Sequence, residues 1–193
     1  MKKQTQRGVV FLDRDGVINV DRKDYVRSWS EFRFLPGVFE AIRLLNKNKI
    51  RAVVVTNQSA VNRGLMSINT LKEIHRKMLT EIRKHGGRIE AIYYCPHTPS
   101  ENCDCRKPKP GMVLKAMRDL QIDLTSSYVV GDSEKEVELA RSLEMKCVQI
   151  SEKIPGKPST KGHGWTFKWP VRAQSLHEAV SYISQDLKES LPS

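Results

Sequence analysis

The amino-acid sequence predicts an α/β fold in which a parallel sheet is flanked by helices. Short apolar runs of strand length alternate along the chain with longer segments whose apolar residues recur at helical spacing. Strands that alternate with helices of this length form parallel sheets with right-handed crossover connections. The 193 residues are enough for one domain with a buried core. We therefore expect a single domain over residues 1–193, with a C-terminal loop and helix at 151–193.

The first expected strand, Val9–Leu12, leads directly into two carboxylates, Asp13 and Asp15, and then into Gly16. Alternate residues of an extended strand point in the same direction, so the two acids can face one site. Neighbouring carboxylates repel each other unless they share a proton or bind a cation. Taken alone, this stretch fits a Mg²⁺ or acid/base site and a solvated turn about equally well.

The alternation of helices and strands continues to the end of the chain. Helices are expected from Pro36, from near Ser67 to Gly86, from Pro110, over 133–143 and over 175–187, and strands over 50–55, 89–94, 128–130 and 146–150. The segment 20–35 has no clean period and is expected to be an irregular loop. The segment 151–172 is rich in Pro, Gly and Lys, so we expect a surface loop with a short strand near 165–167.

Polar residues stand at the ends of two further expected strands. Thr56 and Asn57 follow one of them, and Asp132 follows another. Parallel topology brings the carboxyl ends of the strands to one edge of the sheet, where active sites of such folds lie. This convergence favours the catalytic interpretation of Asp13 and Asp15 over the solvated turn.

A second cluster of reactive side chains follows the third expected strand. It contains three cysteines and a histidine within eleven residues: Cys95, His97, Cys103 and Cys105. Four such ligands suit a closed tetrahedral Zn²⁺ site, which would be structural because no position is left for substrate. The alternative is a reduced loop with incidental thiols, and the close packing of four ligands favours zinc. Cys147 lies in an apolar strand and is expected to be an ordinary buried residue.

The chain is strongly basic, with 33 Lys and Arg against 22 Asp and Glu and a formal net charge of +11. Such a balance suggests an anionic partner, which could be a phosphorylated metabolite, nucleic acid or a membrane surface. No apolar run has the length of a signal-peptide core or a membrane span. We therefore expect a cytoplasmic protein with reduced cysteines.

Four short motifs occur in order along the chain: Asp13-x-Asp15-Gly16-Val17, Thr56-Asn57-Gln58, Arg106-Lys107-Pro108 and Gly131-Asp132. Together they resemble the four motifs of the haloacid dehalogenase-like phosphatases. The cysteine-rich loop, 95–105, is similar to that of the small, nearly capless, zinc-containing members, which include heptose bisphosphate and histidinol phosphatases. The resemblance runs from Val9 to Ile150 and implies a Rossmann-like parallel sheet, nearly capless, with a zinc-binding loop.

The resemblance implies a phosphatase that works through an aspartyl-phosphate intermediate. Asp13 would be the nucleophile, and Asp15 would be the general acid that protonates the leaving group and later activates water. Thr56 would hold phosphate oxygens, and Lys107 would offset charge on the transferring group. The expected Mg²⁺ ligands are Asp13, the backbone carbonyl of Asp15, and Asp132.

Three further residues are expected to bind substrate: Asn57, Arg63 and Arg106. Taken alone, Arg106-Lys107-Pro108 favours a solvated basic turn over a phosphate contact, and solvated surface cations fit Arg63 and Arg106 almost as well as a substrate contact does. Glu136 stands where many relatives carry a second acid, usually Asp. Because Ser133 and Glu136 also fit a capping box, we assign Glu136 a structural role and no metal. The remaining histidines show no partner in the sequence and receive no role: His75, His85, His163 and His177.

The loop Gln58–Gly64 resembles that of the heptose bisphosphate enzymes. The resemblance implies removal of the C7 phosphate of D-glycero-D-manno-heptose 1,7-bisphosphate, in nucleotide-heptose biosynthesis. The alternatives are a histidinol-phosphate phosphatase, a polynucleotide 3′-phosphatase and a non-catalytic nucleic-acid-binding module. We expect a small anionic sugar phosphate as ligand, no nucleic-acid or membrane partner, and a monomer.

Overall fold

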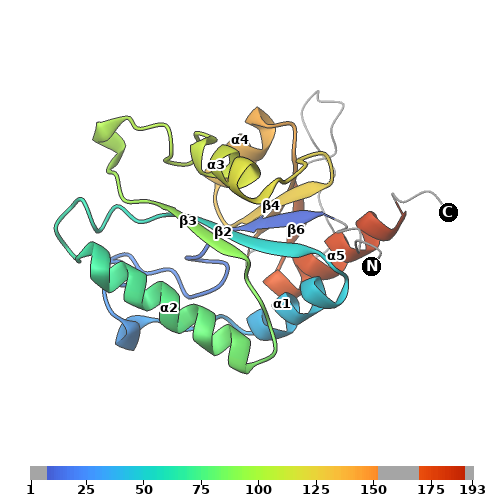
Figure 1. Ribbon diagram of the computed structural model, residues 1–193, viewed down its shortest axis with the longest axis horizontal. Coiled ribbons are helices and arrows are strands. Elements are labelled where there is room, and N and C mark those ends of the chain that lie inside the picture. The colour runs from blue at the N-terminus through green and yellow to red at the C-terminus, as the bar shows by residue number, and fades with distance from the viewer. Residues whose placement is uncertain (1–7, 152–169, 190–193) are drawn as a thin grey trace.

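The structure is a computed structural model that describes residues 8–151 and 170–189 (Figure 1). Its centre is a six-stranded parallel sheet with strand order β3-β2-β1-β4-β5-β6. The strands are β1 (Val9–Leu12), β2 (Arg51–Asn57), β3 (Ala91–Cys95), β4 (Ser127–Gly131), β5 (Lys146–Ile150) and β6 (Val171–Ala173). The strand order reverses direction at β1, and in such sheets the crevice at that point is where ligands bind.

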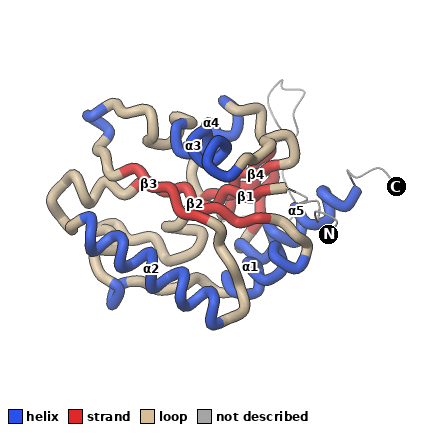
Figure 2. Tube along the Cα trace, viewed as in Figure 1, coloured by secondary structure: helices blue, strands red, loops and turns tan. Residues whose placement is uncertain are grey.

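In the described parts of the chain, five α-helices cover the two faces of the sheet, as Figure 2 shows. They are α1 (Val38–Lys47), α2 (Ile68–Lys84), α3 (Gly111–Leu120), α4 (Glu134–Ser142) and α5 (Leu176–Glu189). Helices α1, α2 and α5 pack on one face with Val10 and Leu12 of β1, and α3 and α4 pack on the other face with Val9 and Phe11. Strand β1 is buried on both faces and lies inside the sheet, between β2 and β4. The acids that follow it therefore lie near the middle of the carboxyl edge of the sheet.

Helix α2 begins and packs as its sequence pattern predicts. The hydroxyl of Ser67 accepts a hydrogen bond of 3.0 Å from the Thr70 backbone nitrogen and so caps the first turn. The buried face contains the four expected apolar residues, Leu71, Ile74, Met78 and Ile82. It also contains His75, which is only 6% exposed.

The C-terminal part of the sheet differs from the sequence prediction. Strand β6, Val171–Ala173, pairs with β5 and begins inside the segment predicted to be a loop, so the loop prediction is wrong for residues 171 and 172. Three residues are too few for a pattern to separate a strand from a loop, and pairing with β5 decides the outcome. The strand expected near 165–167 lies outside the described residues.

The other predicted elements are present with small shifts at their ends. The segment 20–35 is irregular and contains a short 3-10 helix at Trp29–Glu31. Among the described residues, no helix combines the length and the apolar character needed to cross a membrane.

Candidate active site

The polar strand ends converge at the carboxyl edge of the sheet. Strand β1 lies between β2 and β4, so Asp13, Thr56 and Asp132 are brought together from three adjacent strands. The Asp13 backbone nitrogen donates a 2.9 Å hydrogen bond to the Val130 carbonyl oxygen, which continues the β1–β4 ladder into the turn. The predicted convergence of these residues is therefore confirmed.

A buried lysine joins two carboxylates of this edge. The Nζ atom of Lys107 lies 2.9 Å from Oδ1 of Asp13 and 2.7 Å from Oε1 of Glu136. The side chain of Lys107 is 1% exposed and that of Asp13 is 14% exposed, so only the aspartate is open to a ligand. Lys107 is thus a buried cation directed at Asp13, and the alternative of a solvated basic turn is wrong for it.

Asn57 fixes the backbone of this lysine. Its side-chain Nδ2 donates to the Lys107 carbonyl oxygen at 3.1 Å, and its Oδ1 accepts from the Lys107 backbone nitrogen at 3.0 Å. The amide therefore holds the loop after the cysteine cluster against the end of β2. In the described chain, the side chain of Asn57 positions Lys107, a contact that its sequence motif does not reveal.

Glu136 has two separate contacts, one with each of its oxygens. Oε2 accepts from the backbone nitrogen and hydroxyl of Ser133 at 3.2 and 2.6 Å, which confirms the predicted capping box. Oε1 makes the ion pair with Lys107, which the sequence analysis missed. Glycine at position 131 makes room for this approach, since a Cβ there would lie 2.0 Å from Cγ of Glu136.

The carboxylates around Lys107 carry more negative charge than the lysine offsets. Burial raises the pKa of Asp13 to about 7, and the neighbouring Glu136 and Asp15 add to the rise while Lys107 opposes it. Burial, with Glu136 next, raises the pKa of Asp132 to about 6. Asp13, Asp132 and Glu136 each offer an oxygen within 4.8 Å of the others, so this group could hold a metal ion.

Asp15 accepts hydrogen bonds from three residues. Its two oxygens accept from Arg14 at 2.8 and 2.9 Å and from Asn19 and Gln58 at 2.8 Å each. Burial acts to raise the pKa of Asp15, but the charge and hydrogen bonds of Arg14, with those of Asn19 and Gln58, lower it overall. The two acids of the first motif therefore have different environments.

Gly16 allows the turn that follows these two acids. It has a φ of +76°, and a Cβ there would lie 1.9 Å from Oδ2 of Asp132. The side chain of Asp132 thus packs directly on the backbone of the turn that follows Asp13.

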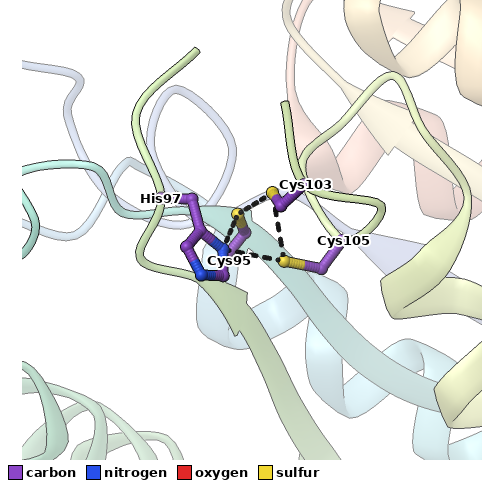
Figure 3. Close-up of side chains that lie close together, drawn as sticks. All are labelled: Cys95, His97, Cys103 and Cys105. Atoms are coloured by element: carbon purple, nitrogen blue, oxygen red, sulfur yellow. Dashed lines mark hydrogen bonds between the residues drawn. The ribbon is translucent and has the colours of Figure 1, made fainter. Parts of the chain in front are cut away.

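The cysteine cluster is assembled as predicted (Figure 3). Sγ of Cys103 lies 3.5 Å from Sγ of both Cys95 and Cys105, and Nδ1 of His97 lies 3.5 Å from Sγ of Cys95 and 3.2 Å from Sγ of Cys105. Ligands of a tetrahedral Zn²⁺ at ordinary bond lengths lie roughly 3.5 to 3.8 Å apart. The four side chains therefore lie close enough together to hold one metal ion.

This cluster is connected to the sheet edge by hydrogen bonds. Arg106 donates from Nη1 to the His97 carbonyl oxygen at 3.0 Å, and the Gln58 backbone nitrogen donates to the Cys95 carbonyl oxygen at 2.7 Å. Lys107 follows Arg106 directly. The loop that carries the cluster thus determines where Lys107 enters the site.

The remaining candidate residues lie around this edge. Thr56 is buried, and its hydroxyl accepts a 2.8 Å hydrogen bond from Gln58. Arg63 is exposed on the loop after β2, where its backbone nitrogen donates to the Ser59 carbonyl oxygen at 3.0 Å. Arg106 is half-buried beside the cysteine loop.

Comparison with known proteins gives consistent results. The family model described as polynucleotide kinase 3 phosphatase matches residues 9–154. The D-glycero-beta-D-manno-heptose-1,7-bisphosphate 7-phosphatase of Pseudomonas aeruginosa is 37% identical over 81% of this chain and 90% of that protein. The protein of the same name from Helicobacter pylori is 33% identical over 93% of this chain and 98% of that protein.

A solved structure is similar over nearly the whole chain. It is the D,D-heptose 1,7-bisphosphate phosphatase of B. bronchiseptica complexed with magnesium and phosphate, with a TM-score of 0.79 and 32% identity over 93% of this chain and 99% of that one. The fold, the order of the strand-end motifs and these relatives agree. This chain is a phosphatase of the haloacid dehalogenase-like superfamily and belongs to the family that the polynucleotide kinase 3 phosphatase model describes, together with the heptose 1,7-bisphosphate 7-phosphatases.

Proposed function

We propose that this enzyme removes the C7 phosphate of D-glycero-D-manno-heptose 1,7-bisphosphate by a Mg²⁺-dependent reaction through an aspartyl-phosphate. The observation that carries the proposal is the partly exposed carboxylate of Asp13, 2.9 Å from the buried Lys107 at the carboxyl edge of the sheet. The choice of substrate is supported by the names of relatives that are 33% to 42% identical.

Asp13, Asp132 and the backbone carbonyl of Asp15 would hold the Mg²⁺. Carboxylate and carbonyl oxygens are the ligands this hard cation prefers, and Asp132 lies against the turn at Gly16 that follows Asp13. The neighbour from B. bronchiseptica contains magnesium and phosphate. When bound, the ion would offset negative charge on the transferring phosphoryl group. Glu136 is already engaged by Lys107 and Ser133, so we leave it out of the ligand set.

In the first half of the reaction, an oxygen of Asp13 attacks the phosphorus atom. The P–O bond to the C7 oxygen of the sugar breaks, and a proton on Asp15 passes to that oxygen as it leaves. Lys107 lies beside the attacking carboxylate and offsets charge that develops on the phosphoryl oxygens.

In the second half, Asp15 takes a proton from a water molecule that attacks the phosphorus of the aspartyl-phosphate. The bond between phosphorus and the Asp13 oxygen breaks, inorganic phosphate leaves, and Asp13 is restored. Arg14, Asn19 and Gln58 favour the ionised form of Asp15, which this step requires of a base; the first half of the reaction uses the minor, protonated form of the same carboxyl group.

The substrate contacts follow from the positions of the polar groups around the edge. Thr56 and Asn57 would contact phosphate oxygens from the end of β2, and because the side chain of Asn57 binds Lys107, its contact would come from the backbone. Arg63 and Arg106 would bind the phosphate that is not hydrolysed, because a guanidinium is suited to an anionic group. Zn²⁺ on the cysteine cluster would be structural.

We also propose that residues 1–193 form one domain that acts as a cytoplasmic monomer on this small ligand, without a nucleic-acid or membrane partner. The C-terminal helix supports the single domain, because buried residues of α5 such as Ala179 and Ile183 belong to the same core as Val10 and Leu12 of β1.

A phosphatase panel with Mg²⁺ tests the choice of substrate. We expect the highest kcat/KM for heptose 1,7-bisphosphate, with the beta anomer preferred because the relatives' names specify it. The other arms are the alpha anomer, histidinol phosphate and a 3′-phosphorylated oligonucleotide. A higher kcat/KM for either of the last two would replace the proposed substrate by that class.

The affinity for Mg²⁺ is expected to fall as the pH is lowered. Burial raises the pKa of Asp13 to about 7 and that of Asp132 to about 6, so acid leaves protons on both proposed ligands. A carboxyl group must lose its proton before it coordinates a metal, so the affinity should drop by up to about tenfold per proton and pH unit below these values. Titration calorimetry between about pH 8 and about pH 5.5 measures this. An affinity that stays constant over this range would contradict these pKa values.

A further inference from the structure

Arg14 is a second buried cation of the site, besides Lys107. Its side chain is 1% exposed, and its Nη2 lies 2.8 and 2.9 Å from the two oxygens of Asp15. Nε of the same guanidinium lies 3.3 Å from Oδ1. A planar guanidinium that contacts a carboxylate at several points restricts the orientation of that carboxylate. The single ammonium group of a lysine restricts it much less.

The outer nitrogen of this guanidinium is held by a residue far away in the sequence. Nη1 of Arg14 lies 3.3 Å from Nε2 of His75, which comes from the buried face of α2. Arginine can only donate, so Nε2 accepts and the imidazole is neutral with its hydrogen on Nδ1. Burial, with the charge of Arg14 next, lowers the pKa of His75 to about 3, which agrees with a neutral ring.

The two buried cations divide the carboxylates of the site. Lys107 pairs with Asp13 and Glu136, whereas Arg14 pairs with Asp15. Two carboxylates so near in sequence would otherwise compete for one cation. The pairing holds the carboxylate of Asp15 on Arg14, while Asp13 and Glu136 share Lys107.

We propose that His75 and Arg14 are positioning residues, in which His75 fixes the guanidinium of Arg14 and the guanidinium in turn fixes Asp15 for proton transfer to the leaving oxygen. This inference rests on the proposed function, because it concerns the general acid of that reaction. Proton transfer requires the acid within hydrogen-bond reach of the leaving oxygen, so a loss of orientation lowers the rate without removing a substrate contact.

The dependence on the leaving group separates positioning from a merely structural role. A sugar alkoxide needs its proton as it leaves, whereas p-nitrophenolate leaves readily without one. The measurement is kcat/KM for heptose 1,7-bisphosphate and for p-nitrophenyl phosphate, in wild type and variants. This constant reports the first half of the reaction, which ends when the leaving group departs.

We expect His75→Leu to lower kcat/KM for the sugar phosphate at least about tenfold more than for the aryl phosphate. His75→Gln should restore most of the loss, because its amide oxygen can accept from Arg14. Arg14→Lys keeps the positive charge but loses the several contacts that the guanidinium makes with Asp15. It should lower the ratio of kcat/KM for the sugar phosphate to kcat/KM for the aryl phosphate, and it provides a second test if His75→Leu folds poorly. Lys77→Ala, a half-buried position of α2 whose amine pairs with Glu73, is the control and should leave kcat/KM unchanged for both substrates.

If kcat/KM falls by the same factor for both substrates in folded His75→Leu and Arg14→Lys, the inference is overturned. A smaller fall for the sugar phosphate than for the aryl phosphate would overturn it as well. Circular dichroism and thermal unfolding establish that each variant is folded. A wild-type enzyme without activity on any phosphomonoester of the panel would instead reject the proposed function. The two failures are therefore distinguishable.

Discussion

The variant Asp13→Asn is expected to lose at least about 10⁴-fold in kcat while keeping its fold. Asparagine has nearly the same shape as aspartate, but its amide cannot form the acyl phosphate. The substitution also removes a charge that burial disfavours, because burial raises the pKa of Asp13 to about 7. Lys107 keeps Glu136 as an ion-pair partner at 2.7 Å, so no buried cation is left unpaired. Steady-state kinetics and thermal unfolding measure the two effects.

Asp119→Asn is the matched control for this substitution. Asp119 is an exposed carboxylate at the end of α3, paired with Lys115 at 2.9 Å, and its variant should retain full turnover. Acid quenching of the wild-type reaction should also leave a phosphoryl group on the peptide that contains Asp13, and the variant should lack it. Substantial turnover by Asp13→Asn would reject Asp13 as the nucleophile.

The parallel sheet and the convergence of the motifs could be predicted because they depend on local patterns. Val9–Leu12 is a continuous apolar run, and such a run between helices predicts a strand buried on both faces. Parallel pairing then brings the ends of β1, β2 and β4 to one edge, whatever the loops between them do. The cysteine cluster is also local, because its four ligands come from eleven neighbouring residues.

The partners of the buried charged groups could not be predicted in the same way. His75 meets Arg14 across 61 positions of the chain, and on α2 it looks like any histidine beside an apolar face. Glu136 satisfies a capping box with one oxygen, and that local explanation conceals the second oxygen on Lys107. Only tertiary packing decides which distant group an ionisable side chain meets. Sequence patterns therefore locate the site but do not reveal how its charges are balanced.

The second large effect is expected from the cysteine cluster. Cys105→Ser should remove one ligand of the proposed Zn²⁺ site and lower the bound zinc well below one ion per chain. Metal binding of this kind contributes directly to folding, so the free energy of unfolding should fall by about 3 kcal/mol or more. For a domain of this size, that corresponds to a decrease of roughly 6 to 12 °C in Tm. Elemental analysis and thermal unfolding measure both quantities.

The same variant should also lose about 100-fold or more in kcat, although Cys105 is not proposed to touch substrate. Lys107 follows the cluster by two residues, and Arg106 between them is tied to the His97 carbonyl oxygen at 3.0 Å. When the loop loses its metal, the position of Lys107 beside Asp13 is no longer fixed from that side.

Cys147→Ala provides the control for this loss. Its thiol lies in β5 among apolar residues outside the cluster, so zinc content and kcat should not change. Full zinc content in Cys105→Ser would contradict the ligand set. Loss of zinc with unchanged kcat would show instead that Asn57, which holds the Lys107 backbone with hydrogen bonds of 3.1 and 3.0 Å, is sufficient to position the lysine. The comparison therefore measures how far catalysis depends on the metal loop, separately from how far the fold does.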